Sequence, residues 1–110
     1  MKNGKLKPSR CPWGKIQSTQ QIAPGITKYS TASHGGYHLT PDLNSKVPEL
    51  LRKATFGGLG EKGWYEEDID WAIVVYVFDE HFDEKIKLAA IECLKQFHTV
   101  TFNRIVQASS

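Results

Sequence analysis

Residues 26–39 read Ile-Thr-Lys-Tyr-Ser-Thr-Ala-Ser-His-Gly-Gly-Tyr-His-Leu, and this stretch decides the fold that we expect for the first half of the chain. Residues 26–31 show the alternation that is typical of a strand. The pair Gly35-Gly36 is predicted to form a tight turn with one glycine at positive φ, because glycine adopts that conformation without steric cost. A further strand is expected over residues 37–39.

The residues before this stretch extend the pattern. Residues 16–22 have mixed strand chemistry, and Ala23-Pro24-Gly25 is a turn signal, because proline presets φ and glycine supplies positive φ. The runs on either side of this turn are therefore expected to pair as a hairpin. Together with residues 37–39 they predict a three-stranded antiparallel meander.

The middle of the chain is predicted to be helical. Ser45 and Pro48 bracket a helix start that leads through residues 50–52. The segment Gly57-Gly58-Leu59-Gly60 is expected to be a flexible connector. Residues 70–78 have the β propensity of a buried strand, but a helix is favoured because acidic residues lie in or near its first turn, where they suit the helix dipole.

The last part of the chain completes the predicted fold. Asp83 is expected to cap a final helix. The apolar stripe of that helix has helical spacing and contains Ile86, Ala89, Ala90, Cys93, Leu94 and Phe97. Residues 99–102 are the candidate for a fourth short strand. The sum is an α+β domain, in which a small antiparallel three-stranded sheet packs against two or three helices.

The composition indicates one globular domain. The chain has 110 residues, of which 40% are hydrophobic and 24% charged, as in ordinary globular proteins. Residues 1–10 are polar and basic, so we expect a flexible basic arm before a single domain over residues 11–110. The longest apolar run, residues 71–78, falls short of the roughly 18 residues of a membrane span. Two cysteines make no disulfide framework, and a cytoplasmic protein without a membrane partner is expected.

The charge is divided unevenly along the chain. Residues 1–53 contain 9 Lys/Arg and 2 Asp/Glu, a net charge of +7, whereas residues 54–110 contain 5 and 10, a net charge of −5. Opposite halves of this kind attract each other within a fold, which is the interpretation we favour. The alternative is a nucleic-acid-binding module that uses the basic first half, although nucleic-acid readers are usually more basic overall.

Two stretches carry side chains that a protein core does not need. Residues 33–38 combine a glycine pair with two histidines, which donate, accept and titrate near neutral pH. Residues 63–71 place four acids between aromatic residues. We expect the two stretches to lie side by side and to form a binding surface. Its candidate residues are His34, Gly35, Gly36, Tyr37, His38, Trp64, Tyr65, Glu66 and Asp68.

The same residues leave an enzymatic alternative open. A small hydrolase or nucleotide-processing enzyme would use His34 or His38 as general base or metal ligand, and Glu66 or Glu67 as a second acid–base group. The spacing of these histidines and acids matches no standard metal motif, so we expect no metal and no cofactor. No G-x-S-x-G motif or P-loop specifies a reaction. A binding protein is therefore favoured over an enzyme.

Three blocks carry a family resemblance. They are Pro12-Trp13-Gly14-Lys15, residues 29–39 followed by Pro41, and Gly63-Trp-Tyr-Glu-Glu-Asp68 with Trp71-Ala72. With these blocks the chain resembles, over residues 11–97, a small domain family of unknown function found in bacteria and on phages and plasmids. The resemblance transfers no catalytic residues. It implies a mobile-element protein that binds a host protein or protein–nucleic-acid complex and inhibits a host defence complex by steric blocking.

Overall fold

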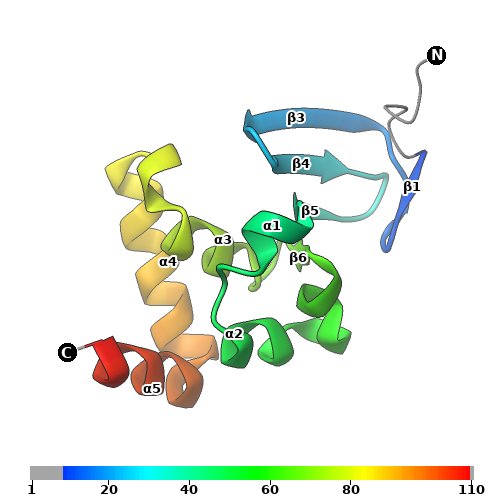
Figure 1. Ribbon diagram of the computed structural model, residues 1–110. Coiled ribbons are helices and arrows are strands. Elements are labelled where there is room, and N and C mark those ends of the chain that lie inside the picture. The colour runs from blue at the N-terminus through cyan, green and yellow to red at the C-terminus, as the bar shows by residue number, and fades with distance from the viewer. Residues whose placement is uncertain (1–8, 110) are drawn as a thin grey trace.

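The computed structural model describes residues 9–109 and has an α+β fold. Its main sheet is antiparallel, with strand order β3-β4-β5-β6 (Figure 1). The strands are β3 (Ser18–Ala23), β4 (Ile26–Ser30), β5 (Gly35–Leu39) and β6 (Trp64–Glu66). A separate two-stranded ribbon pairs β1 (Arg10–Cys11) with β2 (Gly14–Lys15). Of the basic arm expected over residues 1–10, residues 1–8 lie outside the described residues, and Arg10 pairs with Lys15 in this ribbon.

The sheet contains the predicted hairpin and one strand more than the predicted meander. Strands β3 and β4 pair antiparallel around a turn in which Gly25 has a φ of 86°. The fourth strand is β6, which pairs with β5 so that Tyr65 lies opposite Tyr37. The prediction of a strand over residues 99–102 is wrong, because these residues begin helix α5 (Thr99–Ser109). Phe102 and Ile105 pack into the core from that helix at helical spacing, and this packing overrides the β propensity of the threonines.

Gly35 and Gly36 lie inside β5, so the turn predicted there is wrong. The chain reverses just before them, where Thr31 Oγ1 accepts a hydrogen bond from His34 N and donates one to His34 O. Neither glycine has a positive φ. Close packing of the backbone explains the absence of a side chain instead. A Cβ at Gly35 would lie 2.6 Å from the carbonyl oxygen of Tyr29 on the neighbouring strand.

Helices occupy most of the remaining described chain. They are α1 (Pro41–Asn44), α2 (Glu49–Ala54), the 3₁₀ helix η1 (Phe56–Lys62), α3 (Trp71–Val77), the 3₁₀ helix η2 (Asp79–His81), α4 (Glu84–Phe97) and α5. The helix favoured for residues 70–78 is present as α3. Asp83 caps α4 as predicted, by accepting a hydrogen bond from Ile86 N. The expected connector at residues 57–60 lies within η1, where Gly57 and Gly58 supply positive φ.

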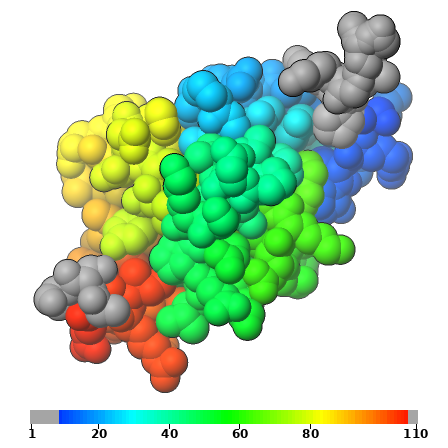
Figure 2. Space-filling model, viewed as in Figure 1, coloured from blue at the N-terminus to red at the C-terminus, as the bar shows by residue number. Residues whose placement is uncertain are grey.

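The two faces of the sheet have different neighbours. Because side chains alternate along a strand, Ile26, Tyr37, Leu39 and Tyr65 share one face, and they pack with side chains of α3 and α4 in the core. The opposite face carries the aromatic residues described below. Figure 2 shows the green segment from α1 to η1 filling the space between the sheet and the C-terminal helix. Within the described residues, no helix combines the length and the apolar content that crossing a membrane requires.

Candidate functional site

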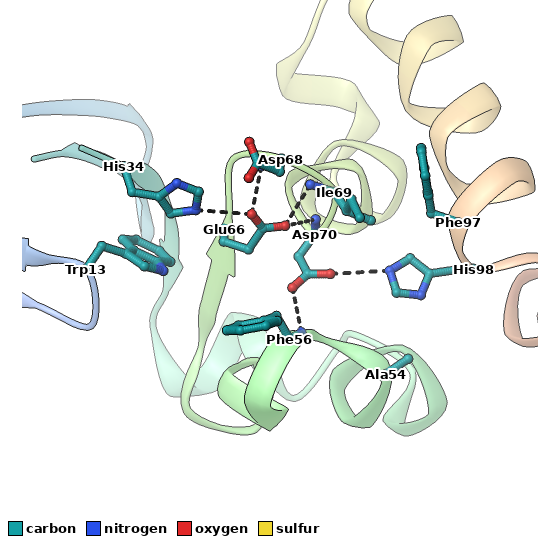
Figure 3. A pocket seen from close by; sticks show the side chains of 10 residues that line it. All are labelled: Trp13, His34, Ala54, Phe56, Glu66, Asp68, Ile69, Asp70, Phe97 and His98. Atoms are coloured by element: carbon teal, nitrogen blue, oxygen red, sulfur yellow. Dashed lines mark hydrogen bonds and ion pairs between the residues drawn. The ribbon is translucent and has the colours of Figure 1, made fainter.

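A cleft of about 490 Å³ opens between the end of the sheet and the junction of α4 with α5. Its lining consists of Trp13, His34, Ala54, Phe56, Glu66, Asp68, Ile69, Asp70, Phe97 and His98. Figure 3 shows Trp13 and His34 on one side, Phe97 and His98 on the other, and Glu66 and Asp70 between them. The cleft thus combines aromatic walls with two histidines, and each histidine lies next to a carboxylate.

Glu66 holds the loop between β6 and α3 in place. Its carboxylate accepts hydrogen bonds from the backbone N–H groups of Asp68 at 2.8 Å, Ile69 at 2.6 Å and Asp70 at 2.9 Å. The Nε2 atom of His34 lies 3.1 Å from Glu66 Oε2. Burial by itself would raise the pKa of Glu66, but the three amides and the histidine outweigh burial and lower it. Glu66 is therefore a charged acceptor that stabilises this loop from strand β6, not an acid within the first turn of a helix.

Asp70 forms the second histidine–carboxylate pair. Its Oδ1 atom lies 3.3 Å from Nε2 of His98, and its Oδ2 atom accepts a hydrogen bond of 2.8 Å from the backbone N–H of Phe56. Asp70 is buried, whereas the side chain of His98 keeps 10% of its surface exposed at the cleft. One carboxylate thus joins the start of α3 to η1 and to the residue that links α4 and α5.

His34 has a carboxylate on each side of its ring. Opposite the contact with Glu66, its Nδ1 atom lies 3.5 Å from Oε2 of Glu67. Glu67 and Asp68 are both exposed, and Asp68 lines the cleft, whereas Glu67 lines a neighbouring hollow with Lys28 and Trp71. One potential ligand atom from each of His34, Glu67 and Asp68 lies within 4.8 Å of the other two. These three side chains therefore form a group that can surround a metal ion.

Trp13 connects the cleft to a cluster of aromatic rings on the sheet. Its ring meets those of His34 and Trp64 edge-on, with centroid separations of 5.8 and 5.6 Å. Trp64 packs in turn on His38 at 4.3 Å and on Tyr29 at 5.6 Å. Burial lowers the pKa of His38, so that its ring is mainly neutral at pH 7. His38 faces this cluster and does not line the cleft.

The sequence as a whole matches a known family. The model of DUF7007, a domain of unknown function, covers residues 6–110. The chain belongs to this family. A search of curated proteins and a search of solved structures each gave no match. Membership of DUF7007 agrees with the resemblance to an uncharacterised family that the sequence blocks indicate.

In this DUF7007 chain the two predicted stretches lie side by side, because β5 and β6 are neighbours in the sheet. The candidate residues separate into three locations. Residues that line the cleft are His34, Glu66 and Asp68, and Glu67 lies next to His34 and Asp68. Residues of the aromatic cluster are His38 and Trp64. Residues buried in the sheet or the core are Gly35, Gly36, Tyr37 and Tyr65.

Tyr65 is a core residue with no accessible surface, although the sequence predicts it as part of a binding surface. Its hydroxyl donates a hydrogen bond of 2.6 Å to Oδ1 of Asn44, and the Asn44 amide donates one of 2.8 Å to the carbonyl oxygen of Gly60. Burial raises the pKa of Tyr65 well above its usual value. The aromatic pair Trp64-Tyr65 is thus divided between the two faces of the sheet, as strand geometry requires.

Seven residues that line the cleft of this family member were not predicted as site residues: Trp13, Ala54, Phe56, Ile69, Asp70, Phe97 and His98. Asp70 was interpreted only as an acid near a helix start, and Phe97 as part of the apolar stripe of the last predicted helix, although Phe97 is 53% exposed. Phe56 and His98 belong to no motif. Asp70 and His98 are 28 residues apart, so a single sequence gives no sign of their pairing. An aromatic residue at a glycine-rich segment, as in Phe56-Gly57-Gly58, was the one available signal.

Proposed function

We propose that this domain is a binding protein whose recognition site is the cleft between the sheet and the α4–α5 junction. The observation that carries the proposal is the exposure of two phenylalanines there: Phe56 is 75% and Phe97 is 53% exposed, and both line the cleft. Exposed aromatic side chains beside a concave surface are typical of interaction sites. A partner that covers them would gain the apolar contacts that the isolated domain lacks.

The charges of the cleft favour a partner with basic side chains. The carboxylates of Glu66, Asp68 and Asp70 line the cleft, and that of Glu67 lies next to His34, 3.5 Å from its Nδ1 atom. Aromatic faces next to carboxylates attract lysine and arginine, both by Coulomb attraction and by cation–π contact. The same charges repel phosphate groups. They argue against nucleic acid in the cleft, and binding through the basic first half stays an alternative without a supporting contact.

The proposed partner is a host protein, or the protein component of a protein–nucleic-acid complex, in the cytoplasm. The resemblance to a family found on phages and plasmids supports this setting. In that setting the domain inhibits a defence complex by covering part of its surface. Steric blocking needs affinity and contact area, which the cleft and its phenylalanines supply, and needs no chemical step.

The experiment compares exposed residues inside and outside the cleft. Tagged wild-type protein and the variants Phe56→Ala, Phe97→Ala and Leu88→Ala are used to capture proteins from host cells, and recovery is quantified by mass spectrometry. Leu88 is the matched control, because it is 56% exposed on α4 and does not line the cleft. A central aromatic contributes about 2 kcal/mol or more, which is roughly 30-fold in affinity.

The proposal requires a protein that wild type and Leu88→Ala recover and that both phenylalanine variants lose. Equal recovery by all four proteins would contradict it. Recovery of no protein above the level of an untagged control would also contradict it.

A second candidate function rests on the two histidine–carboxylate pairs. His34 with Glu66 and His98 with Asp70 face one cleft, an arrangement in which one histidine can take a proton and the other can deliver one. This geometry is suited to an acid–base enzyme. In such an enzyme the second histidine would be His98, and not His38 as the sequence predicts. The variants His34→Gln and His98→Gln separate the two functions. Binding that persists while activity on the bound partner falls by about 100-fold or more would favour the enzyme.

A further inference from the structure

We propose that His34, Glu67 and Asp68 bind a divalent cation of the zinc type at the rim of the cleft. Their potential ligand atoms lie within 4.8 Å of one another. Imidazole nitrogens and carboxylate oxygens are both ligands that Zn²⁺ takes in proteins, and the group offers one of the first and two of the second. Ligands at about 2.0–2.2 Å from a tetrahedral ion lie roughly 3.4 Å apart. The exposed side chains of Glu67 and Asp68 can rotate inward to reach that separation.

The orientation of His34 is an independent reason for the site. Glu66 is buried and tied to three backbone amides, so its charged carboxylate can only accept a hydrogen bond from the ring. The proton of a neutral His34 therefore belongs on Nε2, which is 3.1 Å from Glu66 Oε2. The lone pair of Nδ1 then points toward Oε2 of Glu67 at 3.5 Å. In the neutral form of His34 these two electron-rich atoms face each other, and a metal ion between them replaces the repulsion by two ligand bonds.

Glu66 acts in this site as a positioning residue. Histidines that bind metals usually donate their other ring N–H to a carboxylate, which fixes the tautomer and the direction of the ring. The same carboxylate of Glu66 accepts the backbone N–H of Asp68, and Glu67 N donates a hydrogen bond of 2.9 Å to Gly35 O. The backbone of both acidic ligands is therefore fixed relative to His34 before any ion arrives.

The donor set also selects the ion. Mg²⁺ prefers six oxygen ligands and retains its water, whereas an imidazole ligand favours zinc and its neighbours in the first transition series. Three protein ligands leave at least one position for water or for a group of a bound partner. That position opens at the rim of the cleft. The site does not depend on the proposed function. A bound cation would offset the charges of Glu67 and Asp68 and leave the carboxylates of Glu66 and Asp70 facing a partner, but it would occupy His34 and so exclude that ring from the proton transfer of the second candidate function.

The test is a calorimetric titration of the chelator-treated, full-length protein with ZnCl₂ and separately with MgCl₂. We expect one Zn²⁺ per chain and no saturable binding of Mg²⁺. His34→Gln and the double variant Glu67→Gln/Asp68→Asn should each weaken Zn²⁺ binding at least tenfold, and Glu66→Gln by about 10–100-fold through loss of its positioning role. His81→Gln is the matched control, because His81 is another surface histidine beside a glutamate, Glu80.

The proposal is overturned if the wild type binds no Zn²⁺, or if His81→Gln weakens binding as much as His34→Gln does. Equal affinity of the wild type and the Glu67→Gln/Asp68→Asn variant would also overturn it. Circular dichroism checks that each variant is folded. Should His34→Gln fail to fold, the double variant decides the result, because the side chains at both of its positions are exposed.

Discussion

Gly36 lies where the ribbon β1–β2 meets the main sheet. A Cβ at this position would lie 2.5 Å from the ring of Trp13 and even closer to the carbonyl oxygen of Tyr65. The residue is buried in β5 and has no positive φ. The requirement for glycine is therefore set by a neighbouring indole and a neighbouring backbone, and local chain conformation has no part in it. Trp13 can form the cleft wall because residue 36 has no side chain.

Gly36→Ala is expected to destabilise the protein more than Gly58→Ala. Overpacking against a backbone atom costs about 3 kcal/mol, whereas alanine at the open, left-handed Gly58, with φ of 69°, costs only about 1–2 kcal/mol. Urea denaturation of the two variants and the wild type measures both free energies of unfolding. The reverse order would contradict the packing argument, since φ alone ranks Gly58 as the more sensitive position.

Strand β6 connects several elements although it has only three residues. Trp64 joins the aromatic cluster, Tyr65 enters the core, and Glu66 forms the base of the cleft. The Tyr65 hydroxyl anchors the end of α1 through Asn44, and Asn44 in turn holds η1 through Gly60 O. The position of the cleft thus depends on one short strand and on a buried polar network behind it.

Tyr65→Phe is expected to lower the free energy of unfolding by about 1–3 kcal/mol, because Oδ1 of the buried Asn44 loses its donor. Binding at the cleft should be unchanged, since Tyr65 has no accessible surface. Tyr37→Phe is the control: Tyr37 is also buried, and no hydrogen bond of its hydroxyl is found among the described residues. Thermal and urea unfolding give the stabilities. If Tyr65→Phe changed the affinity for a partner or for Zn²⁺ without lowering stability, the result would contradict the placement of Tyr65 in the core and support its prediction as a binding residue.

Elements with a local chemical signal were predictable from sequence. The Pro24-Gly25 turn, the Asp83 cap and the class of the fold follow from residues that are adjacent or a few positions apart. Strand β6 was missed because Trp64, Tyr65 and Glu66 give a strand only through pairing with Gly36, Tyr37 and His38. A glycine pair gives the same signal for a turn as for a close packing of strands. Only the neighbours of Gly35 and Gly36 distinguish the two.

At the scale of the whole molecule, three of the ten residues that line the cleft could be predicted. His34, Glu66 and Asp68 belong to stretches with unusual chemistry, and the prediction that these stretches lie together is confirmed by the pairing of β5 and β6. Phe56, Phe97 and His98 reach the cleft through the packing of η1 and the α4–α5 junction. The contact of Asp70 with His98 spans 28 residues, and contacts at that distance are set by tertiary packing.

The buried state of His38 predicts a pH dependence of global stability. Burial depresses its pKa in the folded protein below 6.5, so the unfolded chain binds a proton that the folded chain does not. The contribution of neutral His38 to the free energy of unfolding is fully present above pH 6.5. It is lost as the pH decreases through 6.5 toward the lower pKa that His38 has in the folded protein. The wild type should therefore lose more free energy of unfolding between pH 7 and 5 than His38→Gln does.

Chemical denaturation across this range measures the free energy of unfolding of both proteins. The contributions of the carboxylates and of the three other histidines are common to both, so they cancel in the difference. Gly63 and Trp64 lie against the His38 ring, and within residues 9–109 the ring forms no ion pair. Parallel pH profiles for wild type and His38→Gln would show that the ring gains its proton as easily in the folded chain as in the unfolded one.

The ribbon β1–β2 has a consequence for how the cleft responds to an occupant. Two strands of two residues each are marginal by themselves. The ribbon is held to the sheet by the Trp13 ring contacts with His34 and Trp64 and by the hydrogen bond from Gln17 N to Ser30 O. It can therefore detach while the core stays folded. An occupant that contacts Trp13 shifts this local equilibrium toward the attached ribbon. The entropy lost in ordering the ribbon lowers the net affinity for that occupant. This coupling would appear as slower exchange of the amide hydrogens of residues 10–15 with solvent when an occupant is bound.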